Sequence, residues 1–516
     1  MPLAGATLAG PVHPAKLLQR GLEIGRDRPA ILSLEGSLTW AELEDKTNRL
    51  SANYLALGLE PGDRVASLMP NRIELLAHYL ACFKAGLVTT PLNYRYTPPE
   101  IDHALSVSGA RIILAHVERA GDVTASKAAN LPLGIVTYGG EGTGRSLAAL
   151  LQAEPQPIAL PGHDPAAPAV IFFTSGSTGP AKGVTHSFDS LGWLFASAAA
   201  AFEMTDKDIV LPGSSCSHIG GFGLSFSALS AGGQAVVARS FDHAELGPLL
   251  RKMRPTMMSM LPTALLHLIR EEGTTAEDFG SLRLCRSGGD KVPAELEKEF
   301  HALTGRFVSE GYGLTETGLA ARNPPSGLDK LGSIGMVSPG FEFSLRDAEG
   351  TEVPGGEEGR VWLRTHTEMS GYWNDPQATA DVKKDGWFDT GDVMKADADN
   401  YLWFCGRQKQ IIVHDGSNIS PQEVEDALLD HPAVENAGVI GIHDLLHGEN
   451  VRAYVTLKLG VPRPKAAELI TFARNRVGYK APEEIVFLDA MPFNATGKVD
   501  RAKLKALAAG DHAQMQ

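Results

Sequence analysis

The chain alternates short apolar runs with stretches of helical periodicity. The run RVASLM (64–69) precedes a helical pattern at 73–86 and a second apolar run, LVTTPLN (87–93). Another run, PAVIFF (168–173), leads directly into a loop rich in glycine and hydroxyl residues. Buried strands that alternate with amphipathic helices are typical of layered α/β folds. We therefore expect an α/β architecture in which helices cover the sheets.

The pattern changes near residue 330. From there to about 405, β-rich runs such as FEFSLRD (341–347) and GRVWLRT (359–365) are separated by Gly, Pro and Asp turns. An amphipathic helix at 421–432 and two strand patterns, VENAGVIGI and RAYVTLK, follow. We expect five parts: α/β subdomains at 1–165 and 166–330, a small β-barrel-like subdomain at 331–405 that completes an N-terminal domain of residues 1–405, a hinge at 406–410, and a mobile α+β domain at 411–516.

Composition narrows the classes of protein. The 516 residues include 47 Lys and Arg against 61 Asp and Glu, a net charge of −14, which excludes a generally basic nucleic-acid-binding surface. No apolar run reaches 18 residues, so no transmembrane segment is expected. The first 21 residues lack the basic start and continuous apolar stretch of a secretion signal, and the C-terminus matches no targeting signal. We therefore expect a cytoplasmic protein.

The loop after the apolar run at 168–173 has the composition of a phosphate-binding loop. Glycines let backbone N–H groups curve around an anion, hydroxyls add donors, and a lysine adds positive charge. It is not a Walker loop, because Ala181 rather than glycine precedes the lysine. The candidate phosphate-binding residues are Thr174, Ser175, Gly176, Ser177, Thr178, Gly179 and Lys182.

This loop resembles the signature of the adenylate-forming superfamily, which includes acyl-CoA synthetases, peptide-synthetase adenylation domains and firefly luciferases. The usual form has proline directly before the lysine, whereas Pro180 stands one place earlier here. The resemblance extends over almost the whole chain through further motifs: SGGDKVP (287–293), EGYGLTETG (310–318), GYWNDPQAT (371–379), GWFDTGDV (386–393), GRQKQIIVHDGSNISPQEVE (406–425) and PFNATGKVDRAKL (492–504).

The resemblance implies an ATP site, with Mg²⁺ and coenzyme A as further cofactors. By resemblance, Tyr312 stacks on adenine, Thr315 bonds the α-phosphate, and Glu316 holds Mg²⁺, a cation that prefers hard oxygen ligands. The remaining nucleotide-binding residues implied are Gly288, Gly289 and Asp290 in the turn beside adenine, Glu310, Gly311 and Gly313 in the central motif, and Asp392 and Arg407 at the ribose.

Two lysines complete the implied mechanism. Lys409 falls at the hinge position, and Lys498 matches the catalytic lysine that the mobile domain inserts during adenylation. In adenylation, a carboxylate must attack the α-phosphorus of ATP. Both reactants are negatively charged, so positive charge has to be placed between them. A rotating C-terminal domain would then clear the way for the thiol.

The segment SSCSHIGGFGLSFSALSAGGQ (214–234) matches the family segment whose helix walls the acyl pocket. It contains no Asp or Glu, which argues against an amino-acid substrate whose buried ammonium needs a carboxylate partner. Gly220, Gly221 and Phe222 are candidate pocket residues, although these glycines serve close helix packing equally well. By resemblance, His218 lies near the reacting carboxylate and the thiol tunnel.

We therefore expect an ATP-dependent acid–CoA ligase for a medium- to long-chain or bulky apolar acid, aliphatic or aryl. The alternative is a stand-alone ligase that loads a carrier protein, although no residues remain to be assigned to a fused carrier domain. A luciferase-like oxygenase shares the same motifs. A serine hydrolase is disfavoured because no G-x-S-x-G motif is found, and a non-catalytic module because Lys498 and Glu316 are both present. The expected partner is a small acid, and a homodimer stays open.

Overall fold

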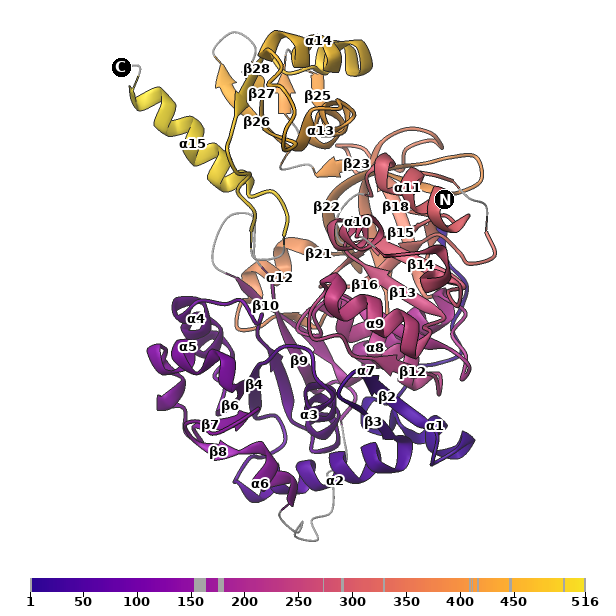
Figure 1. Ribbon diagram of the computed structural model, residues 1–516, viewed down its shortest axis with the longest axis vertical. Coiled ribbons are helices and arrows are strands. Elements are labelled where there is room, and N and C mark those ends of the chain that lie inside the picture. Colours follow the sequence, from indigo (N-terminus) through magenta and orange to yellow (C-terminus); the bar gives the residue numbers. More distant parts are fainter. Residues whose placement is uncertain are drawn as a thin grey trace. The chain divides into compact units, whose positions relative to one another are not determined.

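The computed structural model describes residues 2–514 except 153–163, 175–180, 272, 289–291, 328–329, 408–409, 411, 415–416, 445–447 and 495–496. The chain divides into two compact units. The larger unit comprises Leu3–Phe343 and Leu363–Phe388, and the smaller comprises Met1–Pro2, Ser344–Trp362 and Asp389–Gln516. Strands alternate with helices along the described chain, so the predicted α/β class is confirmed (Figure 1).

The first sheet of the larger unit contains the three apolar runs predicted as strands, which lie next to one another at its centre. Among the described residues its eight strands are, in spatial order, β20 (Gly371–Tyr372), β10 (Lys182–Ser187), β9 (Pro168–Thr174), β5 (Val88–Pro91), β4 (Arg64–Leu68), β6 (Ile112–His116), β7 (Ile135–Tyr138) and β8 (Arg145–Ser146). Strands β9, β5, β4, β6, β7 and β8 run parallel, whereas β10 returns antiparallel to β9. A parallel sheet of this kind needs helices over its faces.

Helix α3 (Ile73–Lys84) confirms the helix predicted between β4 and β5. It ends where Gly86 takes a left-handed φ of 70°, and its side chains are buried from Leu75 to Lys84. Lys84 is tolerated in this interior because its ammonium donates to three oxygens of α2 (Trp40–Ala56). These acceptors are Glu44 Oε2 at 2.7 Å, Thr47 Oγ1 at 2.8 Å and Asn48 Oδ1 at 2.8 Å. A buried ammonium is stable only when its charge and N–H donors are satisfied.

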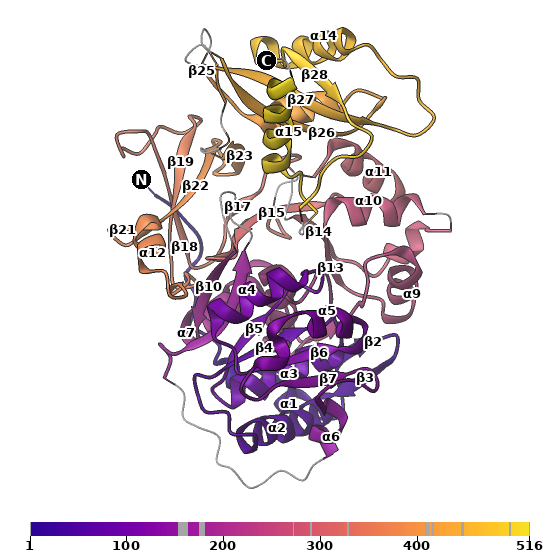
Figure 2. The same ribbon diagram turned by 90° about the vertical axis from the view of Figure 1, so that its left-hand side faces the viewer.

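The second sheet of the larger unit carries the central motif. Its nine strands, counted over the described part of the chain, are β17 (Met336–Val337), β16 (Gly318–Arg322), β15 (Ser309–Leu314), β14 (Leu284–Gly288), β13 (Met257–Met260), β11 (Ile209–Gly213), β12 (Gln234–Val236), β2 (Pro29–Ser33) and β3 (Gly36–Thr39). Helices α9 (His243–Met253), α10 (Pro262–Arg270) and α11 (Ala294–Thr304) lie together beside β13 and β14 (Figure 2).

The remaining described helices of the larger unit connect and cover these strands. They are α1 (Gln19–Ile24), α4 (Pro98–Ser108), α5 (Ala120–Ala125), α6 (Leu147–Gln152), α7 (Phe188–Ala201), α8 (Ile219–Ser230) and α12 (Pro376–Val382). Helix α8 is apolar all round and packs against α7. The ring of Phe222 on α8 is fully buried and contacts five other aromatic rings: Tyr79, Phe83, Phe172, Phe195 and Phe226.

The smaller unit contains a sheet of five described strands with helices on both faces: β25 (Ser417–Ile419), β24 (Ile412–His414), β27 (Gly448–Leu457), β26 (Val434–Asp444) and β28 (Glu484–Phe487). Successive side chains of β27 point to opposite faces. Val451, Ala453 and Val455 join the core formed with α13 (Pro421–Leu429) and α14 (Ala466–Val477). Tyr454 joins a core with Leu504 and Ala508 of α15 (Arg501–Gln514) on the other face. The predicted helix at 421–432 and both predicted strands are therefore present.

The β-rich segment forms a six-stranded sheet with an N-terminal strand added. The described strands are β1 (Leu3–Ala4), β18 (Phe341–Arg346), β19 (Gly359–Thr365), β22 (Trp387–Ala396) and β21 (Lys383–Lys384), with β23 (Leu402–Arg407) beside β22. Strands β18, β19 and β22 each begin in one unit and end in the other. Lys409 of the predicted hinge lies outside the described residues, so the hinge stays a prediction.

We expect Phe222→Ala to lower the free energy of unfolding by about 3–5 kcal/mol, because the substitution leaves a cavity among buried rings. Urea unfolding followed by tryptophan fluorescence measures the loss. Phe307→Ala is the control, since that ring is 36% exposed and its loss should change stability by less than about 1 kcal/mol. Equal losses in the two variants would show that Phe222 does not lie in a packed core.

Candidate active site

The central motif begins in β15, and two of its glycines permit close backbone approach. In the parallel register of β14 and β15, Gly288 lies opposite Gly311, so two separately predicted segments meet here. A Cβ on Gly311 would come within 3.0 Å of the carbonyl oxygen of Ala321, and one on Gly313 within 2.5 Å of the carbonyl oxygen of Gly318. A side chain at Gly313 would collide with this backbone, so only glycine fits at that position of the strand. Gly289 and Asp290 lie outside the described residues.

Glu310, which precedes these glycines, is buried and ties the motif to the turn predicted to border adenine. Its Oε2 accepts a hydrogen bond of 3.3 Å from the amide of Val292. Tyr312, the next candidate on the strand, is partly exposed, as a ring that stacks on a ligand must be. Its adenine contact stays a prediction.

The turn after β15 is held by hydrogen bonds from two distant segments, β10 and residues 367–369. Three consecutive carbonyl oxygens accept hydrogen bonds from distant segments: Thr315 from Nε2 of His186 at 2.8 Å, Glu316 from the amide of Met369 at 2.7 Å, and Thr317 from Oγ1 of Thr367 at 2.6 Å. Because the backbone is fixed in this way, the protein itself determines where the side chains of Thr315 and Glu316 project. Such preorganisation lets donors and charges act on a ligand without reorganising.

His186 is a positioning residue of this turn that the sequence reasoning missed. It is fully buried at the end of β10, and burial lowers the pKa of its imidazole to about 4. The ring is therefore neutral at physiological pH. Because a carbonyl can only accept, the proton is assigned to Nε2, which leaves Nδ1 to accept from Oγ of Ser190 at 3.4 Å. Thr315 lies 129 residues away in the chain, so no local pattern reveals this contact.

The base of the phosphate loop is a paired hairpin. Thr174 at the end of β9 lies directly opposite Lys182 at the start of β10. Ser175, Gly176, Ser177, Thr178 and Gly179 lie outside the described residues. The register nevertheless brings the first and last phosphate-binding candidates together across the two strands.

Tyr372 contacts both Lys182 and Glu316 through different parts of one side chain. Its hydroxyl donates a 2.9 Å hydrogen bond to Oε1 of Glu316. The ammonium of Lys182 lies 4.9 Å from the centre of the same ring. Burial, and next the charge of Glu316, raise the pKa of the Tyr372 phenol far above its usual value, so it remains a donor. The predicted metal ligand and the predicted phosphate-binding lysine are therefore neighbours.

The acyl-pocket candidates lie around the N-terminus of α8. His218 immediately precedes this helix, and its Nε2 lies 3.4 Å from Nδ2 of Asn93. Burial, followed by the charge of Arg95, lowers the pKa of His218. A Cβ on Gly221 would meet the carbonyl oxygens of residues 214 and 215 at 2.6 Å, so backbone packing explains this glycine. Gly220 is exposed, and a Cβ there would make only an ordinary contact, 3.7 Å from Oγ of Ser214.

Asp392 and Arg407, the two ribose candidates, form an ion pair in the smaller unit. They lie opposite each other in the register of β22 and β23, and Nε of Arg407 is 3.0 Å from Oδ1 of Asp392. The carboxylate is 1% exposed, whereas the guanidinium side chain is 48% exposed. The structure therefore brings these two predicted residues together.

Lys498 is exposed on a turn that its own backbone closes. Its amide donates to Oδ1 of Asn494 at 3.1 Å, and its carbonyl oxygen accepts from the amide of Asn494 at 2.8 Å. Just beyond, Arg501 donates two 2.6 Å hydrogen bonds to the buried carboxylate of Glu425 on α13. This ion pair anchors the start of α15, and with it the lysine turn, to the body of the smaller unit.

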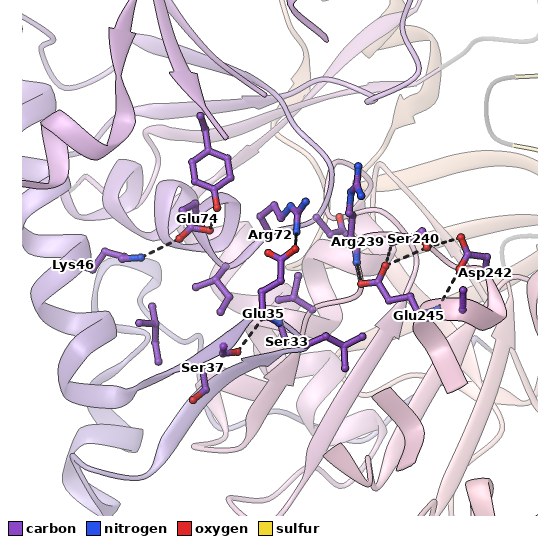
Figure 3. A pocket seen from close by; sticks show the side chains of 18 residues that line it. Ser33, Glu35, Ser37, Lys46, Arg72, Glu74, Arg239, Ser240, Asp242 and Glu245 are labelled. Atoms are coloured by element: carbon purple, nitrogen blue, oxygen red, sulfur yellow. Dashed lines mark hydrogen bonds and ion pairs between the residues drawn. The ribbon is translucent and has the colours of Figure 1, made fainter. Parts of the chain in front are cut away.

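A separate cavity of about 610 Å³ opens in the larger unit (Figure 3). Its three lining cations each pair with a carboxylate: Lys46 with Glu74 at 3.1 Å, Arg72 with Glu35, and Arg239 with Glu118. Its lining residues, all from the described chain, include none of the predicted site residues. The cavity therefore does not present a cluster of unneutralised positive charge to a nucleotide.

Comparison with known proteins identifies the family of the chain. Residues 18–373 match the family model of AMP-binding enzymes, and residues 423–498 match that of the AMP-binding enzyme C-terminal domain. A feruloyl-CoA synthase from Amycolatopsis sp is 34% identical over 474 residues, 91% of this chain and 94% of the relative. The fatty acid–[acyl-carrier-protein] ligase ScoC from Streptomyces coeruleorubidus is 34% identical over 498 residues, 94% of each chain.

A solved structure matches as well. ATP-bound MatB from Rhodopseudomonas palustris superimposes with a TM-score of 0.88 at 29% identity, covering 96% of this chain and 98% of that one. The chain belongs to the AMP-binding enzymes of the adenylate-forming superfamily. Within that family it is an AMP-forming ligase of the acyl-CoA synthetase type. No helix in the described part of the chain is long and apolar enough to cross a membrane.

We expect acid to destabilise the larger unit through His186. The unfolded imidazole binds a proton near pH 6.5 and the folded one near pH 4, so the unfolded state holds more protons between these values. The stability that His186 contributes is complete above pH 6.5 and is lost as the pH falls toward 4.

Wild type should therefore lose about 2–3 kcal/mol more than His186→Gln between pH 7 and pH 4.5 in urea unfolding. The glutamine amide retains a donor but does not titrate. The buried His78, whose pKa burial lowers to about 3, is present in both proteins and cancels from the comparison. Equal acid sensitivity in the two proteins would contradict a buried neutral His186.

Proposed function

We propose that the enzyme activates a bulky or medium- to long-chain apolar carboxylic acid, aliphatic or aryl, and transfers the acyl group to coenzyme A. The acid's carboxylate oxygen attacks the α-phosphorus of ATP, which releases pyrophosphate and forms an acyl-adenylate. The thiol sulfur then attacks the acyl carbon and releases AMP. The observation that carries the proposal is the fixed turn at 315–317. In this turn Glu316 accepts a hydrogen bond from Tyr372, whose ring also contacts Lys182.

The candidate site residues would act mainly by charge and position. Lys182 would draw the phosphates toward the loop, and the hydroxyl of Thr315 would donate to the α-phosphate. Little proton transfer is needed, because the main barrier is repulsion between the carboxylate and the triphosphate. Lys498 would offset the charge that develops as pyrophosphate leaves, and Asp392 with Arg407 would hold the ribose.

Glu316 fits a site for Mg²⁺. No group of three potential metal ligands occurs among the described residues, which fits a cation held by one carboxylate together with substrate phosphates. When bound, the cation would neutralise charge on the phosphate oxygens. Tyr372 would hold the carboxylate of Glu316 in place for that role.

The apolar acid is supported by the segment 214–234, which contains no carboxylate to pair with an amino-acid ammonium. The two curated relatives are named for an aryl acid and for fatty acids, so both kinds of apolar acid have a precedent. A carrier-protein acceptor is the second candidate, favoured by the similarity to ScoC. A cytoplasmic location and a homodimer stay predictions.

A panel of acids with ATP, Mg²⁺ and coenzyme A tests the proposal. Ferulate, related aryl acids and fatty acids of increasing length should each be scored separately for pyrophosphate and thioester, with phenylalanine as the amino-acid control. We expect acid-dependent pyrophosphate and thioester with at least one apolar acid and neither with phenylalanine. Pyrophosphate without thioester would favour the carrier-protein candidate, and no acid-dependent pyrophosphate at all would contradict the proposal.

We expect Lys498→Ala to lower the rate of adenylate formation by about 10²–10³-fold, the effect of losing one preorganised charge. Thioester formation from supplied acyl-adenylate should stay within about threefold of wild type, because that half-reaction does not involve pyrophosphate. Lys505→Ala is the matched control, because Lys505 is an exposed lysine on α15, the helix that follows the turn of Lys498. Equal loss of both half-reactions would contradict the role of Lys498.

A further inference from the structure

The segment 367–373 joins the two halves of the candidate phosphate site. On one side it holds the central turn, through the amide of Met369 and the hydroxyl of Thr367. On the other side it pairs with β10, where the amide of Ser370 donates to the carbonyl of Thr185 and that of Trp373 to Gly183, both at 2.7 Å. A single short segment therefore fixes the motif strand of one sheet against the loop strand of the other.

Tyr372 is the side chain through which this segment contacts charged groups of both halves. The strand pairing of Tyr372 with Val184 places its ring two residues along β10 from Lys182, which explains the ammonium over the ring face. Its hydroxyl donates to Oε1 of Glu316. An ammonium over an aromatic face is attracted to it, and a phenol that donates to a carboxylate restricts the rotamers of that carboxylate.

We infer that Tyr372 is a positioning residue of the adenylation site, which holds the Glu316 carboxylate ready for Mg²⁺ and seats the Lys182 ammonium toward the ATP phosphates. This inference rests on the proposed function of Glu316 and Lys182. The two functions of Tyr372 are chemically separable. The hydroxyl contacts Glu316, and the ring contacts Lys182. One substitution can therefore remove the hydroxyl alone, and a second can remove the hydroxyl and the ring together.

Tyr372→Phe removes the hydroxyl and keeps the ring. Calorimetric titration of the full-length protein should show ATP binding without Mg²⁺ within about twofold of wild type. With Mg²⁺ present, ATP should bind about tenfold more weakly than to wild type, the usual effect of losing one hydrogen bond to a charged group. The Mg²⁺ concentration for half-maximal pyrophosphate release should rise by a similar factor.

Tyr372→Leu removes the ring as well. ATP binding without Mg²⁺ should then weaken by about three- to fivefold relative to Tyr372→Phe, because the ammonium of Lys182 loses its contact with the aromatic ring. In a Glu316→Ala background, Tyr372→Phe should have less than a twofold further effect on binding with Mg²⁺, since the two groups act as one unit.

Tyr138→Phe is the matched control. Its hydroxyl donates to the carboxylate of Glu74 at 2.9 Å in the same unit, and it lies in the wall of the separate cavity. It should cost similar stability in urea unfolding yet leave the Mg²⁺ dependence of ATP binding unchanged. The inference is overturned if Tyr372→Phe shows the wild-type Mg²⁺ dependence, or if Tyr138→Phe shifts it equally. Failure of the proposed function would instead appear in wild type, as no acid-dependent pyrophosphate release.

Discussion

The hydrogen bonds to the carbonyl oxygens of residues 315–317 are the constraint on which the candidate site depends. A turn after a strand has little structure of its own, and here β10, through His186, and the segment 367–373 both hold it. The phosphate-binding loop starts from the strand β9 that pairs with β10. The same contacts therefore set the position of the turn and its relation to the base of the phosphate loop. We propose that their common function is to hold charges in place before two anions are brought together.

Neutral and charged groups have distinct places in this arrangement. His186 is buried and Tyr372 is partly buried, and their pKa values shift in the directions that keep both uncharged, so they act as donors of fixed protonation. The hydroxyl of Tyr372 holds the carboxylate of Glu316, and the ring of Tyr372 lies beside the ammonium of Lys182. During the reaction the site has to change its interactions with the substrate. The side chains that hold its charged residues in place can do so throughout if their own protonation state stays the same.

Local patterns in the sequence predicted the elements well. Strands β4, β5 and β9 and helix α3 follow from apolar runs that are buried almost throughout, and helix α13 follows from apolar positions at helical spacing. The motifs indicated Glu316, Asp392 and Lys498, although not that Asp392 would pair with Arg407. His186 and Tyr372 could not be assigned roles, because their partners lie 129 and 56 residues away and only tertiary packing brings them together. At Gly221, packing against residues 214 and 215 accounts for the glycine without reference to a substrate.

The central claim is that the acid is activated as a mixed anhydride with AMP, and transfer of oxygen tests it most directly. The acid that gives turnover is labelled with ¹⁸O in its carboxylate and converted to thioester with unlabelled ATP and coenzyme A. Mass spectrometry of the nucleotide and pyrophosphate products then follows the label. Our account predicts one ¹⁸O atom in each AMP formed and none in pyrophosphate. Label in pyrophosphate or inorganic phosphate, or AMP that contains no label, would contradict it.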